Sequence, residues 1–468
     1  MWVENMNSVM DDNRTLTLPN GERIRLLPHA CMIVETFDLQ YASPATISRC
    51  GVVWVDPKDL GCRPFFVRWV KDRCLLAERN EEMAVFLELY DRYIPKLMAF
   101  VLEGIVDGEI VRKRLGQVVG MPDIQLVSQL CSMIDANLPA ADELGVARPV
   151  EDRDTIEGLF VYACIWSIGA VLDEESRPVF DEFFKSVASC PMPGGSIYRS
   201  FYDIKNSMWV EWSTRVTKYQ APSPFLFYKV MVPTVDNVIY TDILAKMSAV
   251  AKPTLFVGES GTAKTVTIQN YLENLDPETS LLLTLNFSSK TTADDVYASI
   301  DDATDKRTAR VYGPPTGKKL YTFIDDMSMP KIDEYGTQQP VAFLLFLIAH
   351  NSMYSRDPDL ELRTFKDVVY YAAMAPPGGG RNSIDPRMAM QFAIFNLTTP
   401  TEDVLHAIYS AIIETHTAED FPSGVRDVSK KVTQATLEIF HFLLSTLPPT
   451  PSKFHYLFNL RDLGRVFE

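Results

Sequence analysis

Two kinds of hydrophobic spacing divide the chain. Between residues 61 and 215 apolar side chains recur at helical spacing, as in Met83, Phe86, Leu87 and Tyr90, which predicts a helical domain. Residues 160–172 are apolar nearly all round and predict a buried helix. After residue 232 short apolar runs alternate with helical spacing, which is typical of a parallel sheet in an α/β domain. We expect strands near residues 254–257, 281–286, 320–325, 368–374 and 393–397.

The chain has further segments on either side of these regions. Residues 1–60 contain β-rich runs at 32–37 and 51–56, and we expect an α/β segment there. Residues 216–231 include Ala-Pro-Ser-Pro from Ala221 and predict a linker. Helical spacing returns at Glu402 and is interrupted by prolines between 448 and 451 before a final helix, 457–468.

A glycine-bearing loop joins the first strand of the α/β region to a helix. The strand 254–257 stops at Gly258, and a helical pattern opens with Lys264 and Thr265. This order is typical of a phosphate-binding P-loop, in which backbone N–H groups and the helix N-terminus hold ATP or ADP phosphates. Lys264 would contact the phosphates, and the Thr265 hydroxyl would bind Mg²⁺. The predicted cofactor-binding residues are Gly258, Glu259, Ser260, Gly261, Thr262, Ala263, Lys264 and Thr265.

One position departs from the usual P-loop pattern, because Ala263 stands where a glycine is expected before the lysine. The alternative is a glycine turn without a ligand. A second motif disfavours that alternative: the apolar run 320–324 ends in Asp325 and Asp326, as a Walker B strand does. Asp325 would hold Mg²⁺ through water, and Asp326 would polarise the attacking water. A solvated acidic turn after a core strand is the other interpretation.

Two features, one in the acidic motif and one in the strand 368–374, predict slow ATP hydrolysis. Asp326 is shorter by about one C–C bond of ~1.5 Å than the glutamate usual at its position, and water positioning is sensitive to such displacements. The strand 368–374 ends in Met374 and Ala375, where Asn or Thr often orients the water. Asn382 lies further on, in a glycine-rich loop.

Arg49 stands at the mouth of the run 51–56, just after a short helical turn. Its local sequence favours a surface arginine that caps a carbonyl group. The alternative is an arginine that projects from the edge of the domain.

Composition narrows the classes of function. The chain has 468 residues, 47% hydrophobic and 23% charged, which is typical of a globular protein. A formal net charge of −16 argues against nucleic acid as the main partner. The seven cysteines lack metal-site or disulfide spacing, which indicates a reducing compartment. The apolar runs are too short for a membrane span, and the N-terminus lacks the form of a signal peptide. Both ends resemble the middle of a domain, so we expect a fragment of a longer chain.

Several strings together resemble one family. A P-loop, a Walker B strand and a helical C-terminal piece resemble an AAA+ module, and the further strings are similar to those of dynein heavy chains, most closely the axonemal ones. They are SPATISRCG (43–51), VYGPPTGKK (311–319), IDDMSMP (324–330), PPGGGRN (376–382) and FNLRD (458–462).

The resemblance implies an α/β fold of P-loop AAA+ modules, each a parallel sheet flanked by helices with a helical lid. Residues 1–60 would end the second module's large subdomain, and 61–215 would be its helical lid and connection. After the linker at 216–231, residues 232–400 would be the third module's large subdomain, and 401–468 would start its lid.

The resemblance also implies roles for two arginines. Arg49 would be the arginine finger that acts in trans on the first module's ATP site. Arg461 would be the sensor that touches the γ-phosphate from the lid. Near Arg387 the chain has Met390 where family members often have a second arginine, which puts in doubt a finger acting on the second module's site.

The function implied is that of a regulatory, nucleotide-binding module in a microtubule-based ciliary motor. The partners would be the remaining AAA+ modules of the same heavy chain, dynein intermediate and light chains, and microtubules through a stalk absent here. We expect no nucleic acid and no membrane partner, and a place in the cytoplasm at the axoneme of a cilium or flagellum. The alternative is an AAA+ scaffold with nucleotide as a structural ligand, or a truncated product without motor or ATPase activity.

Overall fold

The computed structural model describes residues 2–36, 38–40, 42–74, 80–138, 152–220, 227, 230–378, 381–417, 421–448, 450, 452–453, 455–456 and 458–468. The chain divides into two compact units, Met1–Gly61 and Cys62–Glu468.

The first unit has short elements only. A 3₁₀ turn η1 (Trp2–Met6) and helix α1 (Asn7–Met10) precede an antiparallel hairpin of β1 (Thr15–Thr17) and β2 (Arg23–Arg25). Two further turns follow, α2 (Pro44–Ile47) and α3 (Pro57–Leu60). The Thr46 hydroxyl donates to Asn7 Oδ1 over 3.0 Å and connects α2 to α1.

The strands predicted at 32–37 and 51–56 are wrong for the residues that the structure describes; Phe37 lies outside them. Residues 32–36 and 51–56 have no regular structure, and Val53 and Val55 are more than 80% exposed. A strand needs a neighbouring strand to pair its N–H and C=O groups. Among the described residues of this unit, neither run has a strand beside it.

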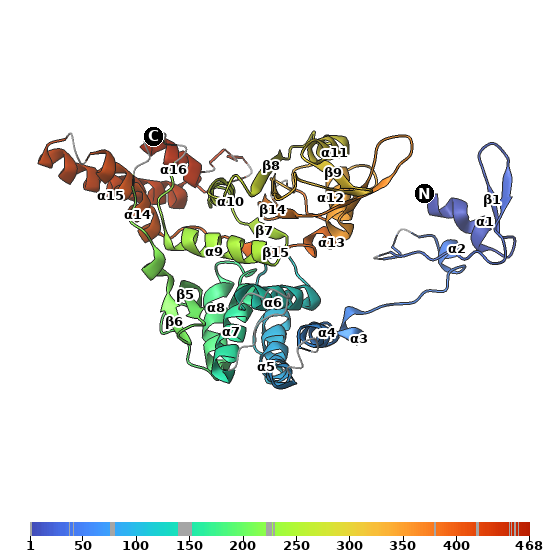
Figure 1. The fold of residues 1–468 in the computed structure, drawn as a ribbon, viewed down its shortest axis with the longest axis horizontal. Coiled ribbons are helices and arrows are strands. Elements are labelled where there is room, and N and C mark those ends of the chain that lie inside the picture. The colour runs from blue at the N-terminus through green and yellow to red at the C-terminus, as the bar shows by residue number, and fades with distance from the viewer. Residues whose placement is uncertain are drawn as a thin grey trace. The chain divides into compact units, whose positions relative to one another are not determined.

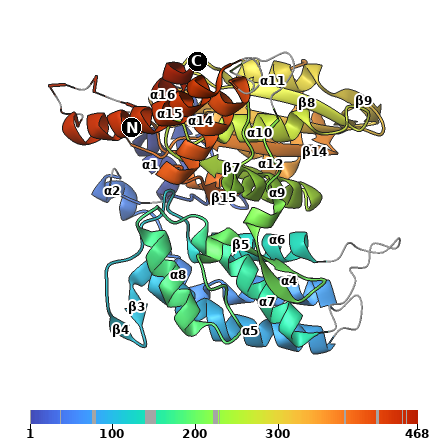
Figure 2. The same cartoon turned by 90° about the vertical axis from the view of Figure 1, so that its left-hand side faces the viewer.

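The second unit begins with the predicted helical domain. Its helices are α4 (Arg63–Cys74), α5 (Asn80–Met98), α6 (Asp123–Asn137), α7 (Arg153–Cys164) and α8 (Ser176–Val187). Figure 2 shows α4 to α8 together as one layer, below α9 in that view. The apolar run 160–172 is buried as predicted, but its middle is a π-helical turn, η4 (Ile165–Gly169). Two hairpins were not predicted: β3 (Ile105–Val106) with β4 (Glu109–Ile110), and β5 (Ser200–Asp203) with β6 (Met208–Glu211).

The α/β region forms a five-stranded sheet, of which β7, β8, β14 and β15 are labelled in Figure 1. The strands are β7 (Thr254–Val257), β8 (Ser280–Asn286), β11 (Lys319–Asp325), β14 (Val368–Met374) and β15 (Ala393–Asn396), all parallel in the order β15-β7-β14-β11-β8. This confirms the predicted strands. The central ones are apolar and buried because helices cover both faces of a parallel sheet. These helices are α9 (Val235–Ala249), α10 (Lys264–Glu273), α11 (Ala293–Asp302), α12 (Gln339–His350) and α13 (Pro386–Ala389).

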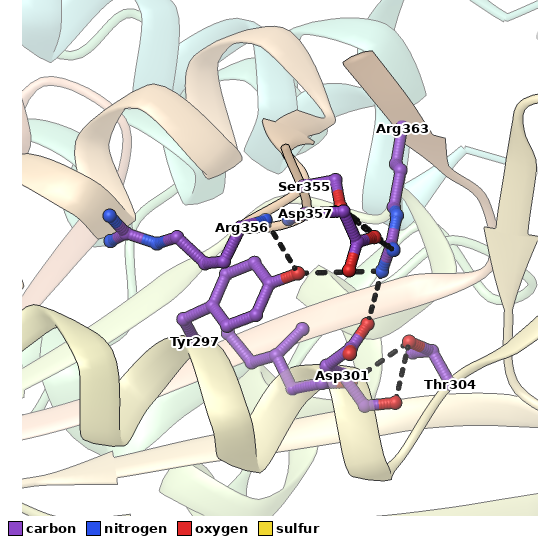
Figure 3. Close-up of polar contacts among 8 residues, drawn as sticks. Tyr297, Asp301, Thr304, Ser355, Arg356, Asp357 and Arg363 are labelled. Atoms are coloured by element: carbon purple, nitrogen blue, oxygen red, sulfur yellow. Dashed lines mark hydrogen bonds and ion pairs between the residues drawn. The ribbon is translucent and has the colours of Figure 1, made fainter. Parts of the chain in front are cut away.

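A second, four-stranded sheet was not predicted. Its order is β12 (Ser352–Tyr354), β13 (Leu362–Phe365), β10 (Val311–Gly313) and β9 (Asp305–Thr308). Figure 3 shows how Arg363 of β13 ties this sheet to α11. The Arg363 guanidinium lies 2.6 Å from Asp301 Oδ1 and 2.9 Å from Asp357 Oδ2, and it donates to Ser355 Oγ over 3.0 Å. Asp301 is 62 positions from Arg363, so no single sequence window predicts this set of contacts.

The C-terminal region is helical, as predicted. Helices α14 (Glu402–His416), α15 (Ser423–Thr446) and α16 (Leu460–Phe467) share a small core that includes Leu405, Leu437 and Leu463. The rings of Tyr409 and Phe467 stack at 4.1 Å. Within the described part of the chain, no helix combines the length and apolar character that crossing a membrane requires.

Candidate phosphate-binding site

The loop between β7 and α10 has the backbone geometry of a tight anion-binding turn. Gly261 has a φ of +91°. A Cβ on Gly258 would come within 2.6 Å of the Leu397 carbonyl oxygen, so only glycine fits there. Ala263 has a φ of 60°, in the left-handed region that costs a non-glycine residue roughly 1–2 kcal/mol. Ala263 therefore has a backbone conformation that glycine adopts without this cost.

Lys264 folds back over this loop. Its Nζ donates to the carbonyl oxygens of Gly258 over 2.8 Å and Glu259 over 2.6 Å. The pKa of Lys264 is lowered to about 8, first by burial and then by the positive charge of Arg381. The carboxylates of Asp326, Glu259 and Asp325 act in the opposite direction. A buried cation beside a glycine-bearing turn at the N-terminus of a helix can bind the phosphates of a nucleotide.

Thr265 and Asp325 meet at the carboxyl edge of the sheet. The Thr265 hydroxyl donates to Asp325 Oδ1 over 3.0 Å. Burial raises the pKa of Asp325, while the Thr265 hydrogen bond lowers it. A hydroxyl and a carboxylate are oxygen ligands of the kind that Mg²⁺ prefers, so the pair fits this ion. Among the described residues no group of three or more His, Cys, Asp or Glu could hold a metal; Mg²⁺ here would depend on phosphate and water oxygens.

Asp326 follows directly and has an exposed side chain. Its φ is 53°, and its N–H donates to Asp325 Oδ1 over 3.1 Å. Its negative charge raises the pKa of Lys264.

Arg381 is the charged residue that the sequence reasoning missed. It follows β14, whose neighbour in the sheet is β7, and its N–H donates to Gly378 O over 3.0 Å. Gly379 and Gly380 lie outside the described residues. The sequence did contain a signal for it. Arg381 is the one basic residue of the glycine-rich loop 376–382, which follows a strand at the carboxyl edge of the sheet. Asn382 instead donates to Pro330 O over 3.0 Å.

The helix that carries Arg461 begins at the phosphate loop. Asn459 caps α16 by accepting from the N–H groups of Arg461, over 2.8 Å, and Asp462, over 3.2 Å. A Cβ on Gly261 would lie 2.9 Å from Leu460 Cβ, so Leu460 packs against the loop. The structure thus brings the start of α16 to the loop, and the Arg461 side chain is exposed there.

Arg49 belongs to the first unit and contacts two residues of that unit, Asp11 and Ala45. Its Nε lies 2.5 Å from Asp11 Oδ1, and its Nη1 donates to Ala45 O over 2.6 Å. The hydrogen bond to Ala45 O is of the kind that the local sequence favoured, whereas the ion pair with Asp11 was not predicted. Near Met390, which is exposed, Arg387 pairs with Asp385 at 2.8 Å.

Two family models match the chain. Residues 219–400 match a P-loop containing dynein motor region, and residues 86–214 match a dynein heavy chain AAA lid domain. The whole chain is 45% identical to "Dynein axonemal heavy chain 10" of Homo sapiens and 43% identical to "Dynein-1-alpha heavy chain, flagellar inner arm I1 complex" of Chlamydomonas reinhardtii. It is 33% identical to "Dynein gamma chain, flagellar outer arm" of the latter organism. The chain spans 10% of the length of each of these relatives.

The fold and the site define a P-loop module of the AAA class with an adjoining lid. The chain belongs to the dynein heavy chains, of the axonemal type, and corresponds to a portion of their motor region.

Proposed function

We propose that this portion contains a regulatory nucleotide site, in the third AAA+ module of an axonemal dynein motor ring. In this proposal residues 232–400 are the module's large subdomain, and 401–468 begin its lid. Residues 61–215 are the lid and connection of the second module, and 1–60 end its large subdomain. The observation that carries the proposal is the convergence of the phosphate loop, Lys264 and the Thr265–Asp325 pair at one sheet edge.

Each residue has a role in binding ATP or ADP. The N–H groups of residues 258–265 bind the phosphates, and Lys264 supplies a point charge. Thr265 and Asp325 would hold Mg²⁺, which would neutralise phosphate charge when bound. Arg461 would reach the γ-phosphate from the start of α16, and Arg381 adds a second cation beside Lys264.

Slow hydrolysis makes regulation the favoured use of this site. Asp326, which is shorter than the usual glutamate, stands at the position that polarises the water. Strand β14 ends in Met374, which has no amide or hydroxyl group to orient that water. The same features support the alternative, a scaffold with nucleotide as a structural ligand. Single-turnover hydrolysis in the full-length heavy chain separates the two, since only a regulatory site should convert its ATP to ADP.

For the whole protein we propose what the names of the relatives suggest. Those names refer to axonemal heavy chains and flagellar arms. The chain would work with the other modules of its heavy chain, with intermediate and light chains, and with microtubules at the axoneme of a cilium or flagellum.

The test of the nucleotide site is binding of fluorescently labelled ATP to the 468-residue chain. Charge-assisted hydrogen bonds contribute roughly 1.5–3 kcal/mol, so Lys264→Ala should weaken affinity at least tenfold. Lys318, which donates to Pro277 O over 2.9 Å, provides a matched control. Lys318→Ala should bind as tightly as the native chain. Unchanged affinity in Lys264→Ala would overturn the assignment.

A further inference from the structure

Side chains of the helical domain hold the edge strand of the five-stranded sheet. Gln129 of α6 donates from Nε2 to Ile394 O over 3.0 Å, and its Oε1 accepts the Ile394 N–H over 2.9 Å. Gln129 is 1% exposed. Its amide thus pairs with β15 as a neighbouring strand would.

The last residue of that strand, Asn396, is fixed from several directions. Its Nδ2 donates to Leu172 O over 2.8 Å, and its N–H donates to Ala170 O over 2.9 Å. Its carbonyl oxygen accepts from Arg177 Nη2 over 2.6 Å and from the Tyr240 hydroxyl over 3.3 Å. Both Asn396 and Arg177 are buried. The helical domain therefore determines where β15 ends.

The next residue, Leu397, contacts the phosphate loop. Its N–H donates to Val257 O over 2.7 Å. Its carbonyl oxygen occupies the space that a side chain on Gly258 would need. Gly258 O in turn accepts from Lys264 Nζ over 2.8 Å. A continuous series of contacts thus runs from Arg177 through Asn396 and Leu397 to Lys264.

We propose that Gln129 and Arg177 are positioning residues for the nucleotide site, through which the helical domain sets the affinity of the neighbouring module. The inference rests on the proposed nucleotide binding. Since coupling of this kind is reciprocal, bound nucleotide should also make the contacts of β15 with the helical domain harder to open.

The helical domain contains a matched control on the same helix. Gln125 of α6 is also buried, and its Nε2 donates to Ala389 O over 2.7 Å. This bond joins the same two regions, but it ends on α13 and not on β15. Gln125→Met and Gln129→Met each remove a buried amide with little change in volume, so both should lower the melting temperature. Gln129→Met should lower it more, because Gln129 makes three hydrogen bonds and Gln125 makes one.

The experiment measures affinity for labelled ATP, melting temperature and hydrogen–deuterium exchange at residues 393–397 in the 468-residue chain. Allosteric coupling typically spans 5–150-fold, so Gln129→Met and Arg177→Met should weaken affinity at least fivefold, and Arg177→Lys should recover part of it. ATP should slow exchange at 393–397 in the native chain and Gln125→Met, but not in Gln129→Met. Gln125→Met should lower the melting temperature with unchanged affinity.

The outcomes separate the two proposals. Equal affinity in Gln129→Met, Gln125→Met and the native chain would show that the contacts are only structural, while nucleotide binding stands. No ATP binding by the folded native chain would overturn both proposals. If Arg177→Met does not fold, Gln129→Met and Arg177→Lys decide the question.

Discussion

The Thr265 hydroxyl donates to Asp325 Oδ1 over 3.0 Å, although sixty positions separate the two residues. Strands β7 and β11 are parallel, so their carboxyl ends meet at one edge of the sheet. The two proposed Mg²⁺ ligands are therefore in contact in the protein alone. Asp326, the next residue, is one methylene shorter than the glutamate usual at that position.

The first prediction is that the 468-residue chain hydrolyses ATP at a rate close to background. An arginine supplied in trans contributes about 10³–10⁵ in rate, and no neighbouring module supplies one to this site. Steady-state phosphate release should be indistinguishable between the native chain and Asp325→Ala. Robust turnover that Asp325→Ala abolishes would contradict this.

The second prediction concerns pH and follows from the lowered pKa of Lys264, about 8. Phosphates favour the charged lysine, so ATP affinity should fall above about pH 8, by at most about tenfold per unit. Titrations between pH 7 and 9.5 measure this. The decline should vanish in Lys264→Ala and persist in Lys318→Ala.

The stability of the ligand-free chain should change in the opposite direction. Between about pH 8 and the ordinary lysine pKa of about 10.4, the unfolded chain binds more protons at this position than the folded chain. The contribution of Lys264 to the free energy of unfolding therefore rises with pH over this window. If Lys264→Ala leaves both profiles unaltered, the site lysine is not the titrating group.

The third prediction is that Ala263→Gly stabilises the chain by about 1 kcal/mol, because glycine adopts a positive φ without strain. Ala342→Gly, on the exposed side of α12, should instead destabilise it by about 1 kcal/mol. Urea unfolding of both variants measures the difference. A loss of stability in both would show that Ala263 is not strained.

The fourth prediction concerns Arg49 in the complete heavy chain. Arg49→Ala should change the melting temperature little, because exposed ion pairs contribute about 0–1 kcal/mol. Arg49→Ala should nevertheless reduce ATP turnover strongly. Arg49→Lys should not restore the turnover, since lysine lacks the planar guanidinium group of arginine.

Asp11→Asn is the matched control, since it removes the same ion pair and keeps the arginine. It should leave ATP turnover unchanged. A large fall in melting temperature with normal turnover in Arg49→Ala would show that the arginine serves only its own unit.

The sequence by itself determined the five strands of the sheet, the phosphate loop and the acidic strand end. Each of these features is formed by one contiguous stretch of sequence, because the residues that make a buried strand or a strand–loop–helix turn are neighbours in the chain. Tertiary structure decided the rest. The runs at 32–36 and 51–56 pair with no strand among the described residues, so apolar character alone does not make them strands. The charge of Arg381 beside Lys264, and the hydrogen bonds of Gln129 with Ile394, join segments that are distant in sequence. Such contacts exist only once the sheet edge and the helical domain have packed together.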